Sequence, residues 1–183
     1  MKVLSGRFKN TVIPFKPQPG LRPTPDRVRK AIIDSLRPAW DGVSVLDLFS
    51  GTGAMGLEAL SAGAASAVFV EADRRRADGI RQVLRHLKLE GECRVESADV
   101  FLTLSRLDDH EERFDRVLAD PPYEKGLALK TLEFFSEGAA LAPGAWIALE
   151  ARYNEPLPDT CGRLTRRKTS EYGDTAVHYY VLV

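Results

Sequence analysis

The sequence predicts an α/β fold, in which helices cover a mostly parallel sheet, on the strength of three observations. First, short apolar runs alternate with segments of helical periodicity from residue 43 to residue 151, as in repeated βα units. Second, two strand-like runs, 162–170 and 175–183, flank Gly173-Asp174 without a helix between them, which predicts a C-terminal antiparallel hairpin. Third, 183 residues with 44% hydrophobic and 28% charged side chains are typical of one globular domain.

A segment of different composition precedes the βα repeats. Residues 1–13 alternate weakly and predict a hairpin around Lys9-Asn10, while five prolines in residues 14–25 predict an extended, irregular stretch. Thr24 and Pro25 have the residue types of an N-cap and a first helical position, and Pro38 is expected to end that helix. We therefore expect an N-terminal extension over residues 1–40, packed on a main domain of residues 41–183.

The main domain is expected to alternate strand and helix in chain order. The predicted strands are 43–48, 66–71, 93–97, 114–119 and 146–151, and the predicted helices are 53–62, 73–89, 100–107 and 127–137. Each strand is a short apolar run, as a strand buried on both faces of the sheet requires. With the two hairpin strands, the expected sheet is seven-stranded.

The net charge of zero conceals an asymmetry. Residues 1–40 hold nine basic and two acidic side chains, whereas the other 143 residues hold 17 basic and 24 acidic ones. A basic extension on an acidic body favours a polyanionic partner, although an ordinary solvated surface accounts for the charge equally well. A second basic cluster, residues 163–168, fits the exposed face of a hairpin strand.

Cysteine content and hydropathy restrict the compartment. Cys93 and Cys161 are too few for a disulfide framework or a four-ligand zinc site, so we expect reduced thiols, no metal and a cytoplasmic protein. No run approaches the ~18–20 apolar residues that span a bilayer. The N-terminus lacks the apolar core of a signal peptide, so neither a membrane nor a secretion signal is expected.

A glycine-rich turn follows the first predicted strand and opens the first helix of the main domain. Gly51, Gly53 and Gly56 match the pattern G-x-G-x-x-G, and Glu71 ends the next strand twenty positions after Gly51. Glycines permit a tight turn and the close approach of a ligand. A carboxylate at the position of Glu71 can accept both ribose hydroxyls of an adenosine. The context therefore predicts an adenosine-containing ligand.

Two acidic residues bear on which adenosine ligand is bound. Asp47, at the end of the first strand, would repel the pyrophosphate of a dinucleotide but attract the amino group and sulfonium of S-adenosylmethionine. Asp99, just after the third strand, either accepts a hydrogen bond from the adenine amine or caps the following helix. The first observation favours S-adenosylmethionine, and the two interpretations of Asp99 stay open.

The segment Asp120-Pro121-Pro122-Tyr123 directly follows the fourth strand. Its prolines stiffen the turn and remove two N–H groups, so carbonyl and carboxylate oxygens are left to accept from an NH₂ group. Tyr123 offers a flat face on which a base can stack. Because the first and fourth strands of a doubly wound sheet end side by side, these acceptors are expected opposite the sulfonium. The pattern predicts methyl transfer to an exocyclic amine that is oriented by two acceptors.

Five segments, in order and at matching spacing, carry a family resemblance. They are residues 22–29 (RPTPDRVR), 47–53 (DLFSGTG), 56–61 (GLEALS), 120–123 (DPPY) and 172–175 (YGDT). Together they resemble the bacterial RsmD family, which methylates the N2 amine of one guanine in 16S ribosomal RNA. The resemblance implies a Rossmann-like class I methyltransferase with a short N-terminal β-hairpin. It also implies S-adenosylmethionine as cofactor and 16S rRNA within a 30S subunit or assembly intermediate as partner, and we expect a monomer.

The resemblance also implies roles for individual residues. The catalytic residues would be Asp120, Pro121 and Tyr123. The cofactor would be held by Asp47, Phe49, Gly51, Thr52, Gly53, Glu71, Asp99 and Val100. The substrate RNA would be contacted by Arg7, Lys9, Arg22, Thr24, Arg29 and Pro122. Contacts from the basic residues to phosphates position an RNA without choosing the base.

Other function classes stay open at this stage. Related motifs also serve methyltransferases that act on the N6 amine of adenine or on protein glutamine, although glutamine enzymes usually carry Asn where this chain has Asp120. A non-catalytic RNA-binding protein and an NAD-dependent oxidoreductase are less favoured. No hydride-acceptor site is recognisable, and 183 residues leave little room for a separate substrate domain.

Overall fold

The computed structural model describes residues 1–14, 24–36, 40–123 and 126–183. Its helices are α1 (Asp26–Ser35), α2 (Ala54–Ala62), α3 (Arg74–Leu87), α4 (Val100–Asp109) and α5 (Leu127–Phe135). Its strands are β1 (Ser44–Leu48), β2 (Ser66–Val70), β3 (Cys93–Glu96), β4 (Phe114–Ala119), β5 (Leu141–Arg152), β6 (Thr160–Cys161), β7 (Leu164–Tyr172) and β8 (Thr175–Leu182).

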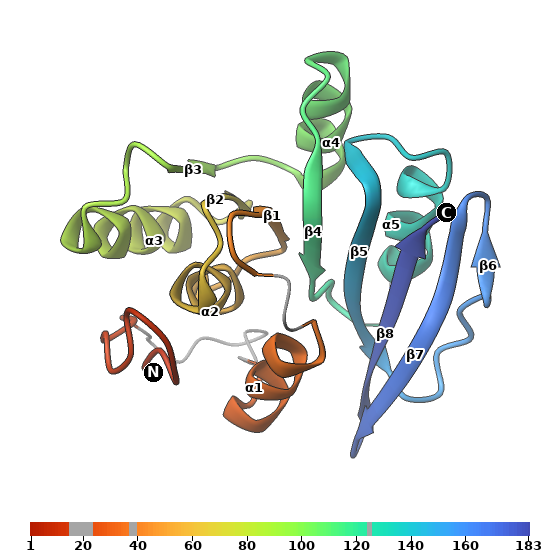
Figure 1. The fold of residues 1–183 in the computed structure, drawn as a ribbon, viewed down its shortest axis with the longest axis horizontal. Coiled ribbons are helices and arrows are strands. Elements are labelled where there is room, and N and C mark those ends of the chain that lie inside the picture. Colours follow the sequence, from red (N-terminus) through yellow and green to blue (C-terminus); the bar gives the residue numbers. More distant parts are fainter. Residues whose placement is uncertain (15–23, 37–39, 124–125) are drawn as a thin grey trace.

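The strands form one sheet of order β3-β2-β1-β4-β5-β8-β7-β6 (Figure 1). Neighbours from β3 to β5 are parallel, and the pairs β5–β8, β8–β7 and β7–β6 are antiparallel. The predicted α/β fold with a C-terminal antiparallel hairpin is therefore confirmed. The expectation of seven strands was one short, because the two-residue edge strand β6 is too brief to leave a period in the sequence.

The largest difference in element bounds concerns β5. This strand begins at Leu141, five residues before the expected start at Trp146. Pro143-Gly144 in this stretch looks like a turn in sequence, since both residue types are unfavourable inside a strand. In the structure, Leu141 pairs with Phe114 of β4, and an irregular register absorbs the proline and glycine before regular pairing resumes at Trp146.

Helices cover both faces of the sheet and create two apolar cores. On one face, α1, α2 and α3 contribute Ile32, Leu57 and Ile80 to the first core. On the other face, α4 and α5 contribute Leu104 and Leu132 to the second. Each helix within the described ranges is too short or too polar to cross a bilayer. This layering leaves the carboxyl ends of the parallel strands as the edge on which a site can form.

Strand β1 lies between β2 and β4, which makes it the point where the chain reverses its direction of winding. Leu48 of β1 is paired with Val70 on one side and with Ala119 on the other. The segments after β1, β2 and β4 therefore emerge next to one another. In doubly wound sheets, ligands bind at this switch point.

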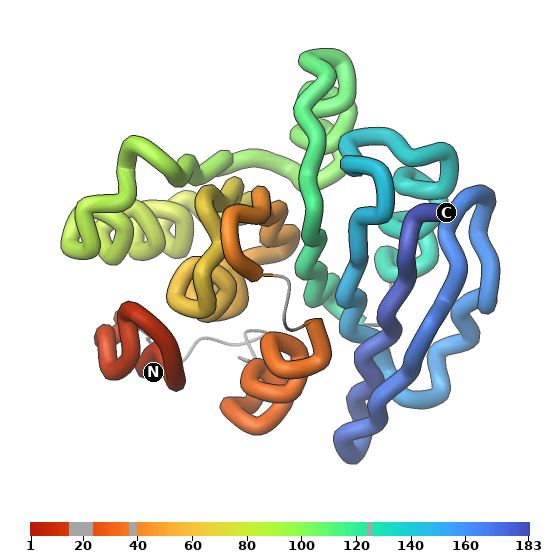
Figure 2. Tube along the Cα trace, viewed as in Figure 1, coloured from red at the N-terminus to blue at the C-terminus, as the bar shows by residue number. Residues whose placement is uncertain are grey.

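Residues 1–14 form a loop that is shaped like a hairpin but has little regular strand pairing (red in Figure 2). A single antiparallel bridge joins Lys2 to Val12, and the Ile13 N–H donates to the Met1 carbonyl. Val3 and Ile13 are each 1% exposed and pack into the core beneath α1, α2 and α3. The expected hairpin around Lys9-Asn10 is thus present in outline, held by apolar burial and by backbone hydrogen bonds such as those between Val3 and residues 10 and 11.

Helix α1 starts differently from the prediction. Pro25, not Thr24, occupies the N-cap position, and no side chain caps the helix. The Val28 and Arg29 N–H groups donate to the Pro25 carbonyl, while the Thr24 hydroxyl donates to Asp120 Oδ2 over 3.0 Å. Threonine before proline is typical of an N-cap, but here the Thr24 hydroxyl bonds to a residue distant in sequence and does not cap the helix. Pro38, the expected end of the helix, lies outside the described residues.

A buried ion pair joins α1 to α2 and corrects one predicted role. The side chain of Arg29 is 0% exposed and lies 3.7 Å from the Glu58 carboxylate, which is 2% exposed. Arg29 also donates to the Lys2 carbonyl and to Asp26 Oδ1, while the Leu4 N–H donates to Glu58 Oε1. The predicted contact of Arg29 with RNA is therefore wrong, because this guanidinium is buried and holds the N-terminal loop.

Ser61, one turn after Glu58 on α2, holds the far end of the same loop. Its hydroxyl accepts from the Phe8 N–H and donates to the Ser5 carbonyl, and its own carbonyl accepts from the Arg7 N–H. Gly6 approaches so closely that a Cβ there would lie 1.9 Å from the Ser61 carbonyl oxygen. The motif at residues 56–61 thus places Glu58 and Ser61 as two anchors for the N-terminal loop.

We predict that Arg29→Met lowers the free energy of unfolding by about 3–5 kcal/mol, the usual cost of leaving one partner of a buried pair unpaired. The reason is that Glu58 stays buried without its cation. Urea denaturation followed by circular dichroism measures the change. The neighbouring Lys30→Met is the matched control, because Lys30 and Asp34 form an exposed pair worth about 1 kcal/mol or less. Equal losses of stability in both variants would contradict the role of Arg29 as a clamp.

Candidate functional site

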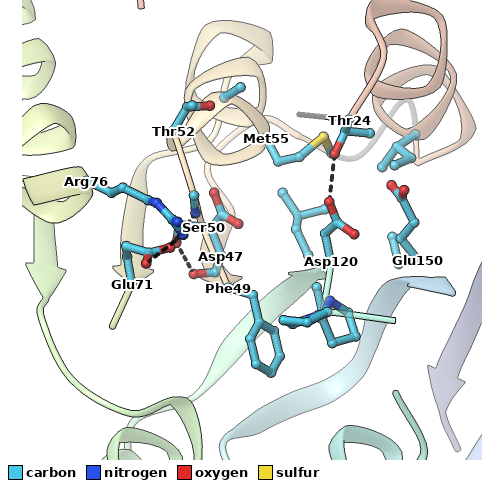
Figure 3. Close-up of a pocket in the computed structure, with 18 of the residues that line it drawn as sticks. Thr24, Asp47, Phe49, Ser50, Thr52, Met55, Glu71, Arg76, Asp120 and Glu150 are labelled. Carbon is cyan, nitrogen blue, oxygen red and sulfur yellow. Dashed lines mark hydrogen bonds and ion pairs between the residues drawn. The ribbon is translucent and has the colours of Figure 1, made fainter. Parts of the chain in front are cut away.

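A cavity of about 420 Å³ opens at the switch point, where β1 and β4 end. Its walls come from the N-terminal segment, the glycine-rich turn, the end of β2, the Asp-Pro-Pro-Tyr turn, and strands β5 and β8. Figure 3 shows Asp47, Glu71 and Asp120 on separate segments around this space, with Thr24 above Asp120. The volume lies within the range of small-molecule sites, roughly 300–1,000 Å³.

Asp47 is fixed by the helix that follows it. Its side chain is 3% exposed, and Oδ2 accepts from the Gly56 N–H over 2.8 Å. Residue 56 must be glycine, since a Cβ there would lie 2.3 Å from the Phe69 ring. Burial raises the pKa of Asp47 well above its usual range, and the nearby carboxylates of Asp120 and Glu71 raise it further. An ionised Asp47 thus carries an unfavourable energy that a bound cation would relieve.

Glu71 closes the other side of the glycine-rich turn. It is 5% exposed, and its two oxygens accept from the N–H groups of Gly51 and Asp73, each over 2.8 Å. Arg76, in the first turn of α3, approaches Glu71 Oε1 to 3.5 Å (Figure 3). The carboxylate is therefore held in one orientation at the cavity wall, with one arginine beside it.

Phe49 adopts an unusual backbone conformation at the start of the turn. Its φ is +55°, a left-handed value that is rare for a residue with a Cβ. The residue lines the cavity, and its ring meets Phe101 of α4 edge to face with centroids 6.3 Å apart. The strained backbone places an aromatic side chain beside the carboxylates, so this part of the wall is apolar.

The Asp-Pro-Pro-Tyr turn forms the wall opposite Glu71. Asp120 lines the cavity and accepts from Thr24, which ties the turn to the segment before α1. Pro121 is buried and Pro122 exposed, and both face the cavity. The hydroxyl of Tyr123 donates to Glu150 Oε1 over 2.8 Å and lies 2.9 Å from Thr175 Oγ1.

The contacts of Tyr123 fix the protonation and placement of its side chain. Burial raises the pKa of its phenol, and the Glu150 carboxylate acts in the same direction. Tyr123 therefore stays neutral and directs its proton to Glu150. Because the hydroxyl is anchored to β5 and β8, the ring is oriented before any ligand arrives.

The charges of the cavity indicate which ligand it accepts. Asp47, Glu71, Asp120 and Glu150 line the same space, and Arg76 lies beside Glu71. Such a site favours a positively charged ligand, and it strengthens the attraction by excluding water from the carboxylates. The N–H groups of Gly51 and Gly56 are already engaged by Glu71 and Asp47, so they do not face a pyrophosphate. The residues present fit S-adenosylmethionine better than a dinucleotide.

Most of the predicted site residues meet at this cavity, and some do not. Gly53 belongs to the glycine-rich turn, where its φ is +74°, but it does not line the cavity. Arg7 and Lys9 are exposed on the N-terminal loop, and Arg22 lies outside the described residues. The predicted residues on the cavity wall are Thr24, Asp47, Phe49, Gly51, Thr52, Glu71, Asp120, Pro121, Pro122 and Tyr123.

Asp99 and Val100 lie outside the cavity lining. Asp99 Oδ1 accepts from the N–H groups of Phe101 and Leu102, so it caps α4, as one of its two interpretations expected. Val100 is 5% exposed within the core under α4 and α5. The contact of these two residues with adenine stays a prediction.

Sequence reasoning missed several cavity residues. Glu150 is buried in β5, and its signal was a single charge inside an apolar run. Thr175 belongs to the YGDT segment, but nothing in that segment pointed to Tyr123. Met1 and Arg76 also line the cavity, and no local pattern marks either of them.

Comparison with known proteins gives a consistent set of relatives. The family described as Conserved hypothetical protein 95 matches residues 1–181. Ribosomal RNA small subunit methyltransferase D of Escherichia coli (strain K12) is 32% identical over 180 residues, covering 98% of this chain and 89% of that protein. The protein of the same name from Haemophilus influenzae is 33% identical over 162 residues, covering 86% of this chain and 81% of its own length.

Solved structures agree with these relatives in fold. The Escherichia coli chain yhhF superposes with a TM-score of 0.85 at 27% identity and covers 100% of this chain and 97% of that one. An RNA methyltransferase from Salinibacter ruber, in complex with S-adenosyl-L-homocysteine, has a TM-score of 0.65 at 18% identity. It covers 88% of this chain and 94% of that chain, and this likeness concerns the fold alone.

We predict that Asp47→Asn stabilises the ligand-free protein and weakens its binding of S-adenosylmethionine. The raised pKa means that ionised Asp47 costs folding free energy at pH values above that pKa, and the neutral amide avoids this cost. The gain in melting temperature at pH 7.5 should shrink as the pH is lowered, because wild-type Asp47 then becomes protonated and no longer carries the cost of a buried charge. Differential scanning calorimetry and isothermal titration measure the two effects.

Asp73→Asn is the matched control for this prediction. Asp73 caps α3 and accepts from the Arg76 N–H, and this bond lowers the pKa of its carboxyl below the usual value. Replacing it should therefore give no gain in melting temperature at pH 7.5. A gain at Asp73 equal to that at Asp47, or no gain at Asp47, would refute the electrostatic account.

Proposed function

This chain belongs to the RsmD family of S-adenosylmethionine-dependent ribosomal RNA methyltransferases, and we propose that it methylates the exocyclic N2 amine of one guanine in 16S rRNA. The observation that carries the proposal is the meeting of Asp47, Glu71 and Asp120 on one cavity at the switch point. The substrate is 16S rRNA within a 30S subunit or an assembly intermediate. The enzyme acts as a monomer in the cytoplasm.

The carboxylates divide into two groups according to what they would hold. Asp47 and Glu71, with the glycine-rich turn between them, would bind the amino acid part and the ribose of S-adenosylmethionine. When bound, this cofactor supplies a methyl group activated by a positively charged sulfur. Asp47 is more easily kept ionised next to that charge, because an opposite charge lowers a carboxyl pKa that burial has raised.

Asp120 and the turn that follows it would hold the nucleophile. The amine of guanine is a weak nucleophile, since its lone pair is delocalised into the ring. Acceptors on Asp120 and on the proline-rich turn would orient the amine hydrogens and stabilise the positive charge that develops on nitrogen. Thr24 donates to one carboxylate oxygen of Asp120, which restricts the rotation of the acceptor before the base arrives.

Tyr123 would supply the stacking surface for the guanine. The hydroxyl is anchored to Glu150 and Thr175, so the ring is held against β5 and β8 rather than rotating freely. A stacked base gains about 1–3 kcal/mol from such a ring. Stacking does not select guanine, and the choice of base rests on the hydrogen bonds made by the turn.

We predict that the wild-type protein transfers labelled methyl groups to 30S particles from cells lacking its gene. Asp120→Asn should reduce the rate of this transfer at least a hundredfold, which is the usual effect of removing one preorganised electrostatic group from an active site. The Asn side chain keeps the shape but lacks the charge that stabilises the amine. Mass mapping of the methylated nucleotide checks the position of the methyl group. Label on adenine, or on protein and not on 16S rRNA, would overturn guanine N2 as the target.

We predict that Tyr123→Ala weakens capture of the RNA base by about 1–3 kcal/mol, while Tyr123→Phe has a smaller effect because it keeps the ring. Single-turnover methylation at limiting RNA measures both variants. Binding of S-adenosylhomocysteine is the control for an intact cavity. If the two variants are equally slow, the hydroxyl anchor rather than stacking accounts for the role of Tyr123.

A further inference from the structure

Two cations lie along the junction of α1 and β7, outside the cavity and outside the roles assigned above. The guanidinium carbon of Arg27 lies 5.5 Å from the centroid of the Tyr172 ring. Lys168 Nζ lies 5.5 Å from the Tyr179 ring and donates to Ser35 Oγ over 3.2 Å. We call Arg27, Tyr172, Lys168, Ser35 and Tyr179 the α1–β7 seam. In this seam Arg27, at the start of α1, contacts Tyr172, and Ser35, at the end of α1, contacts Lys168.

The cations of the seam are exposed and lack acidic partners. Both Arg27 and Lys168 are exposed, and neither forms an ion pair with any carboxylate among the described residues. Two neighbouring basic residues of α1 differ in this respect: Lys30 pairs with Asp34, and Arg29 is buried against Glu58. A cation that is not neutralised within its own chain retains its full attraction for a phosphate.

The arrangement orients these cations as well as exposing them. The contact with the Tyr172 ring favours one placement of the Arg27 guanidinium, whose N–H groups can still donate to a phosphate. The Lys168 ammonium is held by the Ser35 hydroxyl, which leaves it charged because the partner is neutral. The seam is therefore built for anions, in contrast to the carboxylate-lined cavity.

One end of the seam lies at the rim of the cavity. Tyr172 pairs with Thr175 across the β7–β8 turn, and Thr175 lines the cavity and contacts Tyr123. Arg27 follows Pro25, which also lines the cavity, by two residues. A chain that placed one base against Tyr123 would thus have its backbone next to Arg27.

The other end of the seam lies farther along the same edge. Arg27 and Ser35 are eight residues apart on a helix, about 12 Å. Lys168 and Tyr172 are four residues apart on a strand, about 13 Å. The separations along the helix and along the strand agree, so the two cations are spaced to contact different phosphates of one RNA strand. Figure 1 shows the N-terminal loop, α1 and the tip of the β7–β8 hairpin in a row along this edge.

We infer that the α1–β7 seam binds the backbone of the RNA strand next to the target base, with Arg27 on a phosphate at the cavity rim and Lys168 on a phosphate beyond it. The inference rests on the proposed function, because the partner is the same ribosomal RNA. The seam provides phosphate contacts in addition to those that the basic N-terminal loop can make. It also gives the YGDT segment a role, since this turn places Tyr172 under Arg27.

The test compares the double variant Arg27→Gln/Lys168→Gln with the wild type. Affinity for 30S particles from cells lacking the gene is measured by filter binding over a series of salt concentrations. The expected result is weaker binding at low salt and a slope of log affinity against log salt that is smaller by about 1.4, or roughly 0.7 for each phosphate that is no longer neutralised. The charge-preserving variant Arg27→Lys/Lys168→Arg should stay closer to the wild type.

Two controls separate weakened RNA binding from a damaged fold. Arg85→Gln removes an exposed arginine from the last turn of α3, away from the cavity, and should leave affinity and slope unchanged. Binding of S-adenosylhomocysteine to the double variant, followed by calorimetry, should match the wild type. A failure of that binding, or an equal effect of Arg85→Gln, would overturn the specific role of the seam.

The outcomes also distinguish the seam from the proposed function. If wild-type protein methylates 16S rRNA and the double variant keeps its affinity and salt slope, the seam inference is wrong and the function stands. If the double variant shows the expected loss of affinity and smaller salt slope but the wild-type protein methylates no guanine, the seam stands and the assigned reaction fails. If wild-type protein does not bind the particles, both fail.

Discussion

The site depends on a group of carboxylates on one cavity, two of which are almost fully buried from water. Strand β1 lies between β2 and β4, so Asp47, Glu71 and Asp120 come to one cavity from three segments of the chain. Two of them are at most 5% exposed, and burial raises the pKa of Asp47, with a further increase from the nearby carboxylates of Asp120 and Glu71. Backbone N–H groups of the glycine-rich turn hold Asp47 and Glu71 in position in spite of their mutual repulsion. The unfavourable energy is what a cationic ligand relieves, so the binding preference is a property of the protein before any ligand arrives.

The N-terminal segment completes this cavity instead of forming a detached arm. Arg29 and Glu58 form a buried pair that ties α1 and the N-terminal loop to α2. This attachment brings Met1 to the cavity wall and Thr24 onto Asp120. A charge count alone treats Arg29 as one more basic residue on a binding face. Its burial shows that part of the positive charge in residues 1–40 serves folding, and that the acceptor Asp120 depends on a segment almost a hundred residues away in sequence.

The sequence predicted what depends on local pattern. Alternating apolar runs and helical periods indicated the α/β fold and the hairpin, and the residue types around Gly51 and Asp120 indicated both halves of the cavity. Contacts between distant segments left no such pattern. Thr24 had the composition of a helix cap, yet its hydroxyl donates to Asp120, and Pro25 stands at the cap position. β5 was predicted too short because Pro143-Gly144 resembles a turn, whereas pairing with β4 carries the strand through it. Glu150 was detectable only as a charge in an apolar run.

The charge inside the cavity differs from the charge around its rim, and on the proposed function this difference constrains how an RNA strand can approach. Carboxylates dominate the cavity lining, with Arg76 beside them, whereas Arg7 and Lys9 are exposed on the N-terminal loop and Arg27 is exposed on α1. A phosphate would be repelled from the cavity and attracted to the rim, while an uncharged base meets no such repulsion. The electrostatic field therefore favours one arrangement of an RNA strand, with its backbone outside the cavity and a single base turned into it. Removing a base from its stack costs a few kcal/mol, which contacts of the backbone along the rim help to offset. On the proposed function, the distribution of charge therefore orients the RNA strand before hydrogen bonds hold the base.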